Sequence, residues 1–565
     1  MARKRYLSED EYARLINDPT SDTDESDDSF SKELECDISS DSDTDILSET
    51  ELAEFLPSTS HRRTSQDAPF WTRELEVLHP HIFIGTPGTN SVINAGKEID
   101  FFNVFFDDDL LNVIVEETNN FAQNAERSAP STSKSTKFSN LSIADIKVFF
   151  AMIILMGIIK KPSLKMYFIT NEVFATPFFN RVMPRDVFLR ILKCLHFTSD
   201  ASAKKLQKLG LIVDNLKNKF KRTYIPKENI CIDESLFAWK GHLGFRQYVP
   251  SKRSRYGIKI YKSCESVTGY VWNFLIYCGK DTDMSSSDGS YGERVVKTLM
   301  SDLCEKGYNV YLDRFFNSPS LAEYMHSVKT NVCGTVLKTR KKMPKNFPER
   351  KLKKGELDAV QHDNMNIIAF KEKKKGVFML TSIHGPEISK SGRKDRVTGE
   401  DILKPQCILD YNKNMGGIDI GDAVMTHHSC FRKSVKWYKK LFFGLMDITI
   451  LNSNILFDKK HGIKTLILQF KMKLIEQIFE NYGNYREEKQ FPVRSLPAPI
   501  RLTGRHFPTL NVNKNGEKSR RRCIVCSQTV LKERKMKLTF YACSSCNVGL
   551  CVSPCFEVYH TQVSF

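Results

Sequence analysis

The stretch "NICIDESLFAWKG", residues 229–241, is the place where the chain changes from helical to extended periodicity. Before it, from about residue 100 to 228, apolar side chains recur at helical spacing. From residue 229 onward, β-branched and aromatic residues gather in short runs that are broken by glycine and polar turns. Three strands, a helix, a strand, a helix and a strand follow one another, which predicts an α/β domain over residues 229–337.

The α/β pattern is interrupted once and is flanked on both sides by helical periodicity. A Lys-rich stretch and strand-like runs predict a β-rich insertion over residues 338–396, after which residues 397–429 return to the α/β domain. Helical patterns over 96–228 and again over 430–490 predict an all-α region that is split around the α/β domain. The predicted fold is therefore an α/β core with an inserted β-rich subdomain and a split helical domain.

The charge of the chain is strongly uneven. Residues 1–56 carry 18 acidic and 5 basic side chains, so the remainder carries a net charge of +30 although the total is +17. We expect residues 1–95 to be disordered, because this acidic, Ser/Thr-rich composition buries too little apolar surface to offset chain entropy. The basic remainder indicates a polyanionic partner, most often nucleic acid, and the alternative is a merely soluble basic surface.

The chain shows neither a secretory signal nor a membrane-spanning run. Its longest apolar run, "VFFAMIILMGII" at 148–159, is shorter than the ~20 residues that span a bilayer. We therefore expect an intracellular protein whose 15 cysteines are mostly reduced, so clustered cysteines are better candidates for metal ligands than for disulfides. Ser142, directly before "IADIKVFF", is expected to cap the helix that contains the apolar run.

Three aspartates lie at strand ends and at a helix start. Asp233 lies in the first predicted strand, and Asp313 ends the apolar run "NVYLD". Asp419 begins the helix after the insertion, within "CILDYNKNMGGIDIGDAVMTHH" (407–428). An ionised carboxylate at the end of a buried strand is costly unless it is paired or bound to a metal ion. We expect these acids to converge on Mg²⁺ or Mn²⁺, and two such ions can catalyse phosphoryl transfer.

Asp422 follows Asp419 by three residues, so both lie on one helix face near the positive end of the helix dipole. The preceding Gly416 and Gly417 are expected to let the backbone turn and approach the strands closely. The alternative for either aspartate is simple helix capping. Three acids at matching positions in the fold favour a metal site, in which Asp422 is a further ligand or an acid next to the ligands.

Four blocks of the sequence resemble the signature blocks of piggyBac transposases and their genomic derivatives. They are "IDESLFAWKG", "FRQYVPSKRSRYGIKIY", "YNVYLDRFFNSPSLA" and "DYNKNMGGIDIGD", and the resemblance extends from about residue 95 to the last residue. It implies an RNase H-like catalytic domain with an aspartate triad at Asp233, Asp313 and Asp419, and with Asp422 as an additional acid near two Mg²⁺ or Mn²⁺ ions. It also implies a helical DNA-binding and dimerisation domain that is split around the catalytic domain.

The same resemblance implies a cut-and-paste reaction, with nicking at the 3′ ends of an element, hairpin formation on those ends and joining at TTAA targets. The implied partners are double-stranded DNA (terminal inverted repeats and target) and a second copy of the chain. One residue departs from the family pattern, because relatives commonly carry Asn after the second aspartate and this chain carries Arg314. Adjacent strand residues point to opposite faces, so Arg314 need not enter the metal site, although a nearby guanidinium would compete with a cation for Asp313.

Two basic segments with interleaved aromatic residues are predicted to contact DNA. They are "FRQYVPSKRSRYGIKIYK" (245–262) and "CFRKSVKWYKK" (430–440). Lys and Arg neutralise phosphates, and Tyr248 and Tyr256 offer faces for exposed bases. The alternative for the first segment is a solvated hairpin edge that lysines protect from aggregation. The predicted contacts are Arg246, Lys252, Arg253, Arg255, Lys259, Lys262, Arg432, Lys433 and Lys436.

A cysteine-rich unit at 521–562 follows a Pro/Gly/basic linker at 491–520. Its two CxxC pairs are separated by 16 residues, a pattern typical of structural zinc, and so small a unit usually needs metal to fold. The candidate ligands are Cys523, Cys526, Cys543, Cys546, Cys551, Cys555 and His560. Seven ligands leave two tetrahedral sites one short, so we expect one or two Zn²⁺ ions. His506 is a distant candidate for the eighth ligand, and spacing does not fix the pairing.

These features support three functional hypotheses. The first is a nuclear, metal-dependent DNA transposase, in which "KSRRR" at 518–522 is an import signal, a phosphate contact or both. The second is a domesticated, transposase-derived nuclear DNA-binding protein without transposition activity. The third treats the cysteine-rich unit as a chromatin reader or ubiquitin-ligase module, and it leaves the aspartates unexplained.

Overall fold

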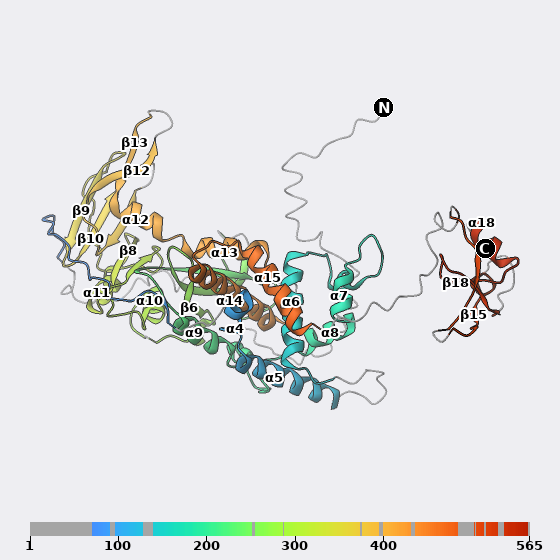
Figure 1. The fold of residues 1–565 in the computed structure, drawn as a ribbon. Helices are drawn as coiled ribbons and strands as arrows, with labels where there is room; N and C mark the ends of the chain where they lie inside the picture. Colours follow the sequence, from blue (N-terminus) through green and yellow to red (C-terminus); the bar gives the residue numbers. More distant parts are fainter. Residues whose placement is uncertain are drawn as a thin grey trace. The chain divides into compact units, whose positions relative to one another are not determined.

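The computed structural model describes much of the chain, in two units that Figure 1 shows coloured along the sequence. The first unit extends to Gly483, and the second contains the cysteine-rich residues. The described residues are 70–90, 96–127, 139–250, 255–285, 287–372, 376–394, 399–430, 436–483, 502, 504–513, 516–528 and 536–562.

A mixed β-sheet forms the centre of the first unit. Its core strands are β3 (Asn229–Ala238), β5 (Tyr256–Glu265), β6 (Val271–Ile276), β7 (Asn309–Leu312) and β8 (Asn331–Thr335). Their order is β6-β5-β3-β7-β8, in which β3, β5 and β6 pair antiparallel while β3, β7 and β8 pair parallel. Parallel strands need crossover connections, and these contain α10 (Tyr291–Met300) and α11 (Pro319–Ser327). The predicted order of strands and helices is confirmed.

The insertion adds three further strands to the same sheet. β11 (Val377–Thr381) pairs with β8, and β10 (Met365–Phe370) and β9 (Leu357–His362) follow outward. An independent β-rich subdomain would form a sheet of its own, whereas these strands extend the core sheet by antiparallel pairing. The core sheet and most of the insertion therefore share one layer.

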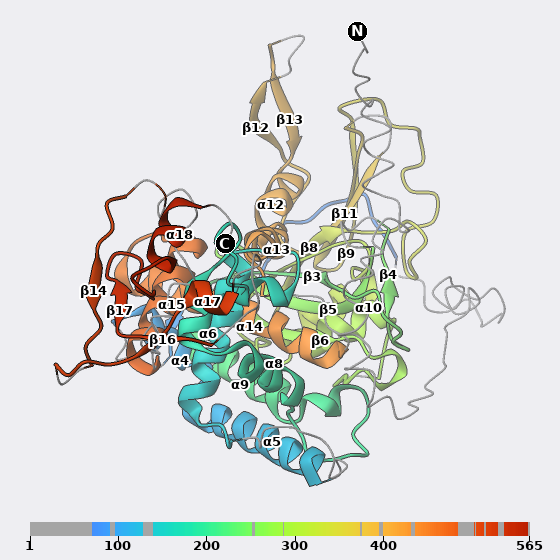
Figure 2. The ribbon, with the colours of Figure 1, turned by 90° about the vertical axis from the view of Figure 1, so that its right-hand side faces the viewer.

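A separate hairpin completes the insertion. β12 (Ile388–Lys394) and β13 (Asp401–Pro405) pair with each other in a two-stranded sheet and project away from the main sheet (Figure 2). The chain then returns to the core at α12 (Gln406–Asn414). This return lies later than the predicted boundary at residue 397, because β13 still belongs to the hairpin.

Helices from two separate stretches of sequence pack against each other. α6 (Ile143–Ile158) contacts α15 (Ile467–Tyr482), and α4 (Glu98–Asn103) contacts both α14 (Trp437–His461) and α15. The two predicted helical stretches thus form one packed region, although the α/β sequence lies between them. The remaining α-helices described in this region are α5 (Asp108–Arg127), α7 (Pro177–Val182), α8 (Arg185–Cys194) and α9 (Ile212–Thr223).

α14 is long and apolar enough to cross a membrane by length and composition, but 94% of its apolar window is buried inside the fold, as in a core helix. A buried polar network ties this helix to the sheet. Glu265, at the end of β5, accepts hydrogen bonds from Lys459 Nζ at 3.1 Å and from the backbone N of Lys227 at 2.8 Å. Burial would raise the pKa of Glu265, but the bonds from Tyr224 and Lys227 and the charge of Lys459 hold it below its ordinary value.

Residues 70–90 pack on the first unit, so the prediction of disorder over 1–95 is wrong for this segment. Thr72 and Gln361 of β9 exchange two backbone hydrogen bonds of 2.9 Å each. The acidic composition that predicts disorder ends before this segment, whose backbone groups find partners at the sheet edge. Residues 1–69 lie outside the described residues.

The C-terminal unit is small and is built from short elements. Its strands are β14 (Pro508–Leu510), β17 (Tyr541–Cys543) and β18 (Val548–Gly549) in one sheet, and β15 (Arg521–Arg522) with β16 (Leu538–Thr539) in another. α17 (Ile524–Gln528) packs against α18 (Cys555–Thr561). Cysteines make up much of its buried core, so few apolar side chains are available to hold the unit together.

The helix cap predicted at Ser142 is confirmed. Ser142 Oγ accepts from the backbone N of Asp145 at 3.2 Å, and the carboxylate of Asp145 accepts from the backbone N of Ser142 at 2.9 Å. This reciprocal pair satisfies two amides at the start of α6, the helix whose apolar run is buried in the helical region.

We expect Ser142→Ala to lower the free energy of unfolding by about 1 kcal/mol, because it removes this cap. Chemical denaturation of the full chain measures the change. Ser163→Ala is the matched control, since Ser163 also precedes a helix but makes no capping bond with its side chain. Equal losses in both variants would contradict the assigned cap.

Candidate active site

Asp233 and Asp313 lie side by side at one edge of the sheet. β3 and β7 run parallel, and Ile232 is the partner of Leu312 in their register. Each aspartate is the next residue along its chain, and neighbouring strands are about 4.8 Å apart, so both acids leave adjacent strands at the same level. The sequence predicts that the two acids lie close together, and the register of β3 with β7 places them side by side.

Both aspartates are half-buried and accept hydrogen bonds from nearby residues. Asp313 Oδ1 accepts from the backbone N of Arg314 at 2.6 Å and from Thr335 Oγ1 at 2.9 Å. Asp233 Oδ1 accepts from the backbone N of Glu234 at 2.8 Å. The side chain of Arg314 forms no ion pair with Asp313 in the described part of the chain, and the residue is exposed. These contacts orient the two carboxylates without a competing guanidinium.

Tyr411 of α12 belongs to this site, although the sequence analysis does not single it out. Burial raises the pKa of its hydroxyl, and the charges of Asp313 and Asp233 raise it further, while a hydrogen bond with Thr335 opposes them. Thr335, which also donates to Asp313, is therefore a shared neighbour of this phenol and of the Asp313 carboxylate. The only signal in the sequence is the position of "DYN" shortly before "MGGID".

The helix α13 (Gly417–His427) carries the other two acids and packs directly on β3 and β5. A Cβ atom on Gly417 would lie 2.9 Å from the carbonyl oxygen of Ser266 and 3.0 Å from Cys231 Sγ, so glycine permits this approach. Gly416 has ordinary helical backbone angles (φ −77°), and its nearest neighbour would be 3.9 Å from a Cβ atom. The expectation of close approach is confirmed for Gly417 and is wrong for Gly416.

Asp419 and Asp422 have different surroundings on α13. Asp419 lies in the first turn and is exposed. Asp422 is half-buried, and its Oδ1 lies 2.7 Å from Lys262 Nζ. Lys262 is 1% exposed, so its prediction as a DNA contact is wrong. The side chain of Lys262 leaves β5 on the face that α13 covers, which periodicity alone does not show.

The four aspartates do not form a closed set of ligands. Within the described ranges, two sets of three or more candidate ligands have their donor atoms within 4.8 Å of one another, and both lie in the C-terminal unit. Carboxylates of like charge repel one another, which opposes close approach. The fold thus pairs Asp233 with Asp313 and packs the helix that carries Asp419 and Asp422 over the same strands, but it does not bring all four oxygens to ligand distance.

An exposed basic and aromatic cluster lies on the hairpin between β4 (Gln247–Tyr248) and β5. The guanidinium of Arg246 lies 5.0 Å from the centre of the Tyr256 ring, which is 4.8 Å from the Tyr248 ring. Lys259 is half-buried. The other described candidates are Arg255, which is exposed, and Lys436, which is half-buried. The candidates Lys252, Arg253, Arg432 and Lys433 lie outside the described residues.

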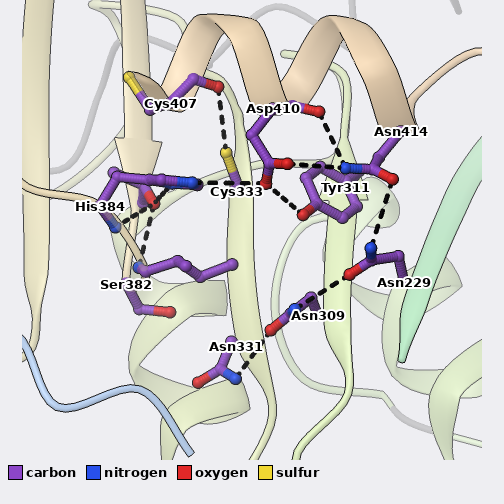
Figure 3. Close-up of polar contacts among 12 residues, drawn as sticks. Asn229, Asn309, Tyr311, Asn331, Cys333, Ser382, His384, Cys407, Asp410 and Asn414 are labelled. Carbon is purple, nitrogen blue, oxygen red and sulfur yellow. Dashed lines mark hydrogen bonds and ion pairs between the residues drawn. The ribbon is translucent and has the colours of Figure 1, made fainter. Parts of the chain in front are cut away.

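A partly buried polar network fixes α12 on the sheet (Figure 3). Asp410 Oδ2 lies 3.3 Å from His384 Nε2, and it accepts a hydrogen bond from the Tyr311 hydroxyl. Burial would raise the pKa of Asp410, but the bonds from His384 and Tyr311 hold it below its ordinary value. Tyr311 lies on β7, so the network joins the helix that carries Tyr411 to the strand that leads into Asp313.

Four asparagines extend this network across the first residues of the parallel strands (Figure 3). Asn229 Nδ2 donates to Asn414 Oδ1 at 3.4 Å, and Asn309 Nδ2 donates to Asn229 Oδ1 at 3.0 Å. Asn331 Nδ2 donates to Asn309 Oδ1 at 2.9 Å. The chain of amides runs from the end of α12 over β3, β7 and β8, and it stabilises the register that aligns the two acids.

The C-terminal unit gathers all seven predicted ligands, and His506 with them, into two sets. One set is Cys523, Cys526, Cys551 and Cys555, and the other is His506, Cys543, Cys546 and His560. Four thiol or imidazole ligands are what a structural Zn²⁺ ion takes. The sets interleave along the chain, so the first CxxC pair shares a site with the last two cysteines. The expectation of His506 as the eighth ligand agrees with this geometry.

Comparison with known proteins assigns these features to a family. A family model described as Transposase IS4 matches residues 97–454, which is more than half of the chain. The chain belongs to the Transposase IS4 family. A second model, described as a DDE_Tnp_1-like zinc finger, matches residues 501–561. The cysteine-rich unit is therefore similar to zinc fingers of this type.

Relatives of this transposase-family chain include human proteins. It is 23% identical over 478 residues to human PiggyBac transposable element-derived protein 3, covering 82% of this chain and 76% of that protein. It is 22% identical over 436 residues to human PiggyBac transposable element-derived protein 5, covering 72% and 80%. A cryo-EM structure of a piggyBac transposase synaptic complex with hairpin DNA has a TM-score of 0.61 at 22% identity, covering 83% of this chain and 98% of that chain. The fold is shared, and the resemblance to piggyBac transposases is confirmed.

We expect Gly417→Ala to lower the free energy of unfolding by about 1–3 kcal/mol, because the added methyl group meets backbone and a thiol at the packed start of α13. Urea denaturation of the full chain measures it. Gly416→Ala, one residue earlier, is the control, and it should be neutral or stabilising by up to about 1 kcal/mol. Equal destabilisation by the two variants would contradict the assigned contact.

We expect His506→Ala to lower the zinc content from two ions per chain to one, because it removes a ligand from one of the two sets. Native mass spectrometry of the zinc-loaded full chain measures the ratio. His242→Ala is the control, since His242 is exposed and lies in neither set. Retention of both ions in His506→Ala would show that this histidine is not a ligand.

Proposed function

We propose that this member of the Transposase IS4 family is a piggyBac-type DNA transposase that cuts and rejoins DNA strands by metal-dependent phosphoryl transfer. The observation that carries the proposal is the pairing of Asp233 and Asp313 on adjacent parallel strands, with Asp419 on a helix packed over β3. The strand order β6-β5-β3-β7-β8 supports an RNase H-like catalytic domain. In this assignment the three aspartates are the catalytic DDD triad.

Two Mg²⁺ or Mn²⁺ ions fit the chemistry of these donors, because carboxylate oxygens are the hard ligands that such ions prefer. Asp233, Asp313 and Asp419 would hold them. When bound, the ions supply positive charge to the attacking and leaving oxygens of a phosphodiester. The rest of the site contributes orientation, since Thr335 holds one oxygen of Asp313 by a hydrogen bond.

The proposed substrate is double-stranded DNA, as terminal inverted repeats and as TTAA targets. The net charge of +30 outside the acidic first 56 residues supports a polyanionic substrate. The cluster of Arg246, Tyr248 and Tyr256 combines a cation with stacking faces, which suits backbone and base contacts. The predicted Lys-rich segment of the insertion supports the same partner, since it exposes Lys341, Lys345, Lys351, Lys353 and Lys354.

We further propose that the protein works as a homodimer in the nucleus. The two ends of an element both have to be cut, and two copies of one active site meet this need by symmetry. The segment "KSRRR" supports nuclear import, because its four basic residues are exposed on the C-terminal unit.

A second candidate function is a domesticated nuclear DNA-binding protein that no longer transposes. It is favoured by the names of the human relatives, which are transposable element-derived proteins. The placement of Asp233 and Asp313 favours the enzyme instead. DNA binding without any cleavage in Mg²⁺ or Mn²⁺ would support the domesticated function.

We expect Asp313→Asn to lower Mn²⁺-dependent nicking by at least ~100-fold, equivalent to about 3 kcal/mol of transition-state stabilisation. The assay uses the full chain and a plasmid that carries the genomic sequences flanking its coding region. Asp109→Asn is the control, since Asp109 is an exposed carboxylate in the first turn of α5, away from the sheet edge. Nicking by Asp313→Asn at the wild-type rate would show that the assigned site is wrong.

A further inference from the structure

Lys262 is a buried lysine beside the candidate metal ligands. Its side chain is 1% exposed, and its Nζ lies 2.7 Å from Asp422 Oδ1. Asp422 is the one carboxylate within 4.0 Å of this ammonium in the described part of the chain. Burial of an ammonium group costs free energy unless an opposite charge stays beside it. The pair is therefore a firm link between β5 and α13, unlike an ion pair on the surface.

The link lies next to the acids that are proposed to bind metal. Lys262 is the cross-strand partner of Asp233 in the pairing of β3 with β5, so the two side chains leave the sheet on the same face. Cys231 and Cys264 are the next cross-strand pair on that face, and Cys231 Sγ would lie 3.0 Å from a Cβ atom on Gly417 of α13. These groups therefore cluster beneath α13.

The packing of α13 explains why Asp422 meets Lys262. Gly417 brings the first turn onto the strands, and Gly421 faces α14 on the other side, since a Cβ atom there would lie 3.2 Å from Leu451 Cδ2 of α14. A rotation or a slide of α13 would separate Asp422 from Lys262 and leave a buried charge without its partner. Asp419 lies on the same helix, so the same link limits where its carboxylate can go.

We propose that Lys262 is a positioning residue that serves as the internal counter-ion of Asp422 and holds α13 over β3 and β5. Asp422 is then not a metal ligand, and the metal ions are left to Asp233, Asp313 and Asp419. The inference rests on the proposed metal-dependent function and deepens it by giving the fourth acid a separate role.

The charges of the pair determine what each substitution does. Removal of Lys262 alone takes away a positive charge and frees a fourth carboxylate, so a divalent cation binds more tightly. Removal of the Asp422 charge alone leaves an unpaired ammonium opposite Asp233, so the cation binds more weakly and the fold loses stability. Removal of both charges leaves the net charge of the site unchanged and no buried charge unpaired. The contact of Gly417 with the strands then still seats α13, so cation binding stays as in the wild type.

The test measures Mn²⁺ affinity of the zinc-loaded full chain by electron paramagnetic resonance, in Lys262→Met, Asp422→Asn and the double variant. Asp419→Asn is the reference variant. The Mn²⁺ binding that is present in the wild type and lost in this variant is the binding assigned to this site. We expect the Kd to be about threefold lower in Lys262→Met and about tenfold higher in Asp422→Asn, and the double variant to stay within about twofold of the wild type. Without Mn²⁺, each single variant should melt about 5 °C lower, and the double variant within about 2 °C of the wild type.

The double variant decides the question. A Kd about tenfold higher than that of the wild type would overturn the proposal, because Asp422 would then be a ligand. Melting losses that simply add in the double variant would overturn it as well. Lys227→Met is the control for charge, since Lys227 is an exposed lysine shortly before β3, and it should leave both measurements unchanged.

A failure of the proposed function gives a different result. If Asp419→Asn leaves Mn²⁺ binding unchanged, the metal site is wrongly assigned. The melting temperatures of the four combinations at Lys262 and Asp422 still report whether the two residues act as a pair.

Discussion

The close contact between the first turn of α13 and strands β3 and β5 is the constraint on which the site depends. Gly417 has no side chain, and any larger residue would meet the carbonyl oxygen of Ser266 and the thiol of Cys231. This contact brings a helix that follows a long insertion back to the strand that carries Asp233. Without this contact, Asp419, which lies more than a hundred residues after Asp233 in the sequence, has no fixed position near the sheet edge.

Polar contacts inside the fold support this arrangement from two sides. On one side, Asp410 accepts from Tyr311 and pairs with His384, which fixes α12 just before α13 begins. On the other side, buried Glu265 binds Lys459 and so joins the end of β5 to the long core helix α14. A carboxylate shielded from water is costly to separate from its hydrogen-bond partners, so the sheet, α12 and α14 hold their relative positions. Helices α12 and α14 therefore pack together with the strands that carry the acids as one structure.

Much of the core and half of the acidic site follow from periodicity. Asp233 and Asp313 were predictable because each directly follows an apolar run, and the parallel register of β3 and β7 places those runs side by side. The role of Lys262 was not predictable from the sequence, because tertiary packing decides which face of β5 is covered by α13. The strands of the insertion extend the sheet through edge pairing, which local patterns do not reveal. His506 lies too far from the other ligands for any spacing rule to include it firmly.

The position of bound Mn²⁺ is the most direct test of a metal site at Asp233 and Asp313. Anomalous X-ray diffraction from crystals of the full chain grown with Mn²⁺ locates the ion without reference to activity. The account predicts a peak about 2.0–2.3 Å from carboxylate oxygens of both Asp233 and Asp313. Mn²⁺ bound elsewhere in the molecule, with the Asp233–Asp313 pair empty, would contradict it.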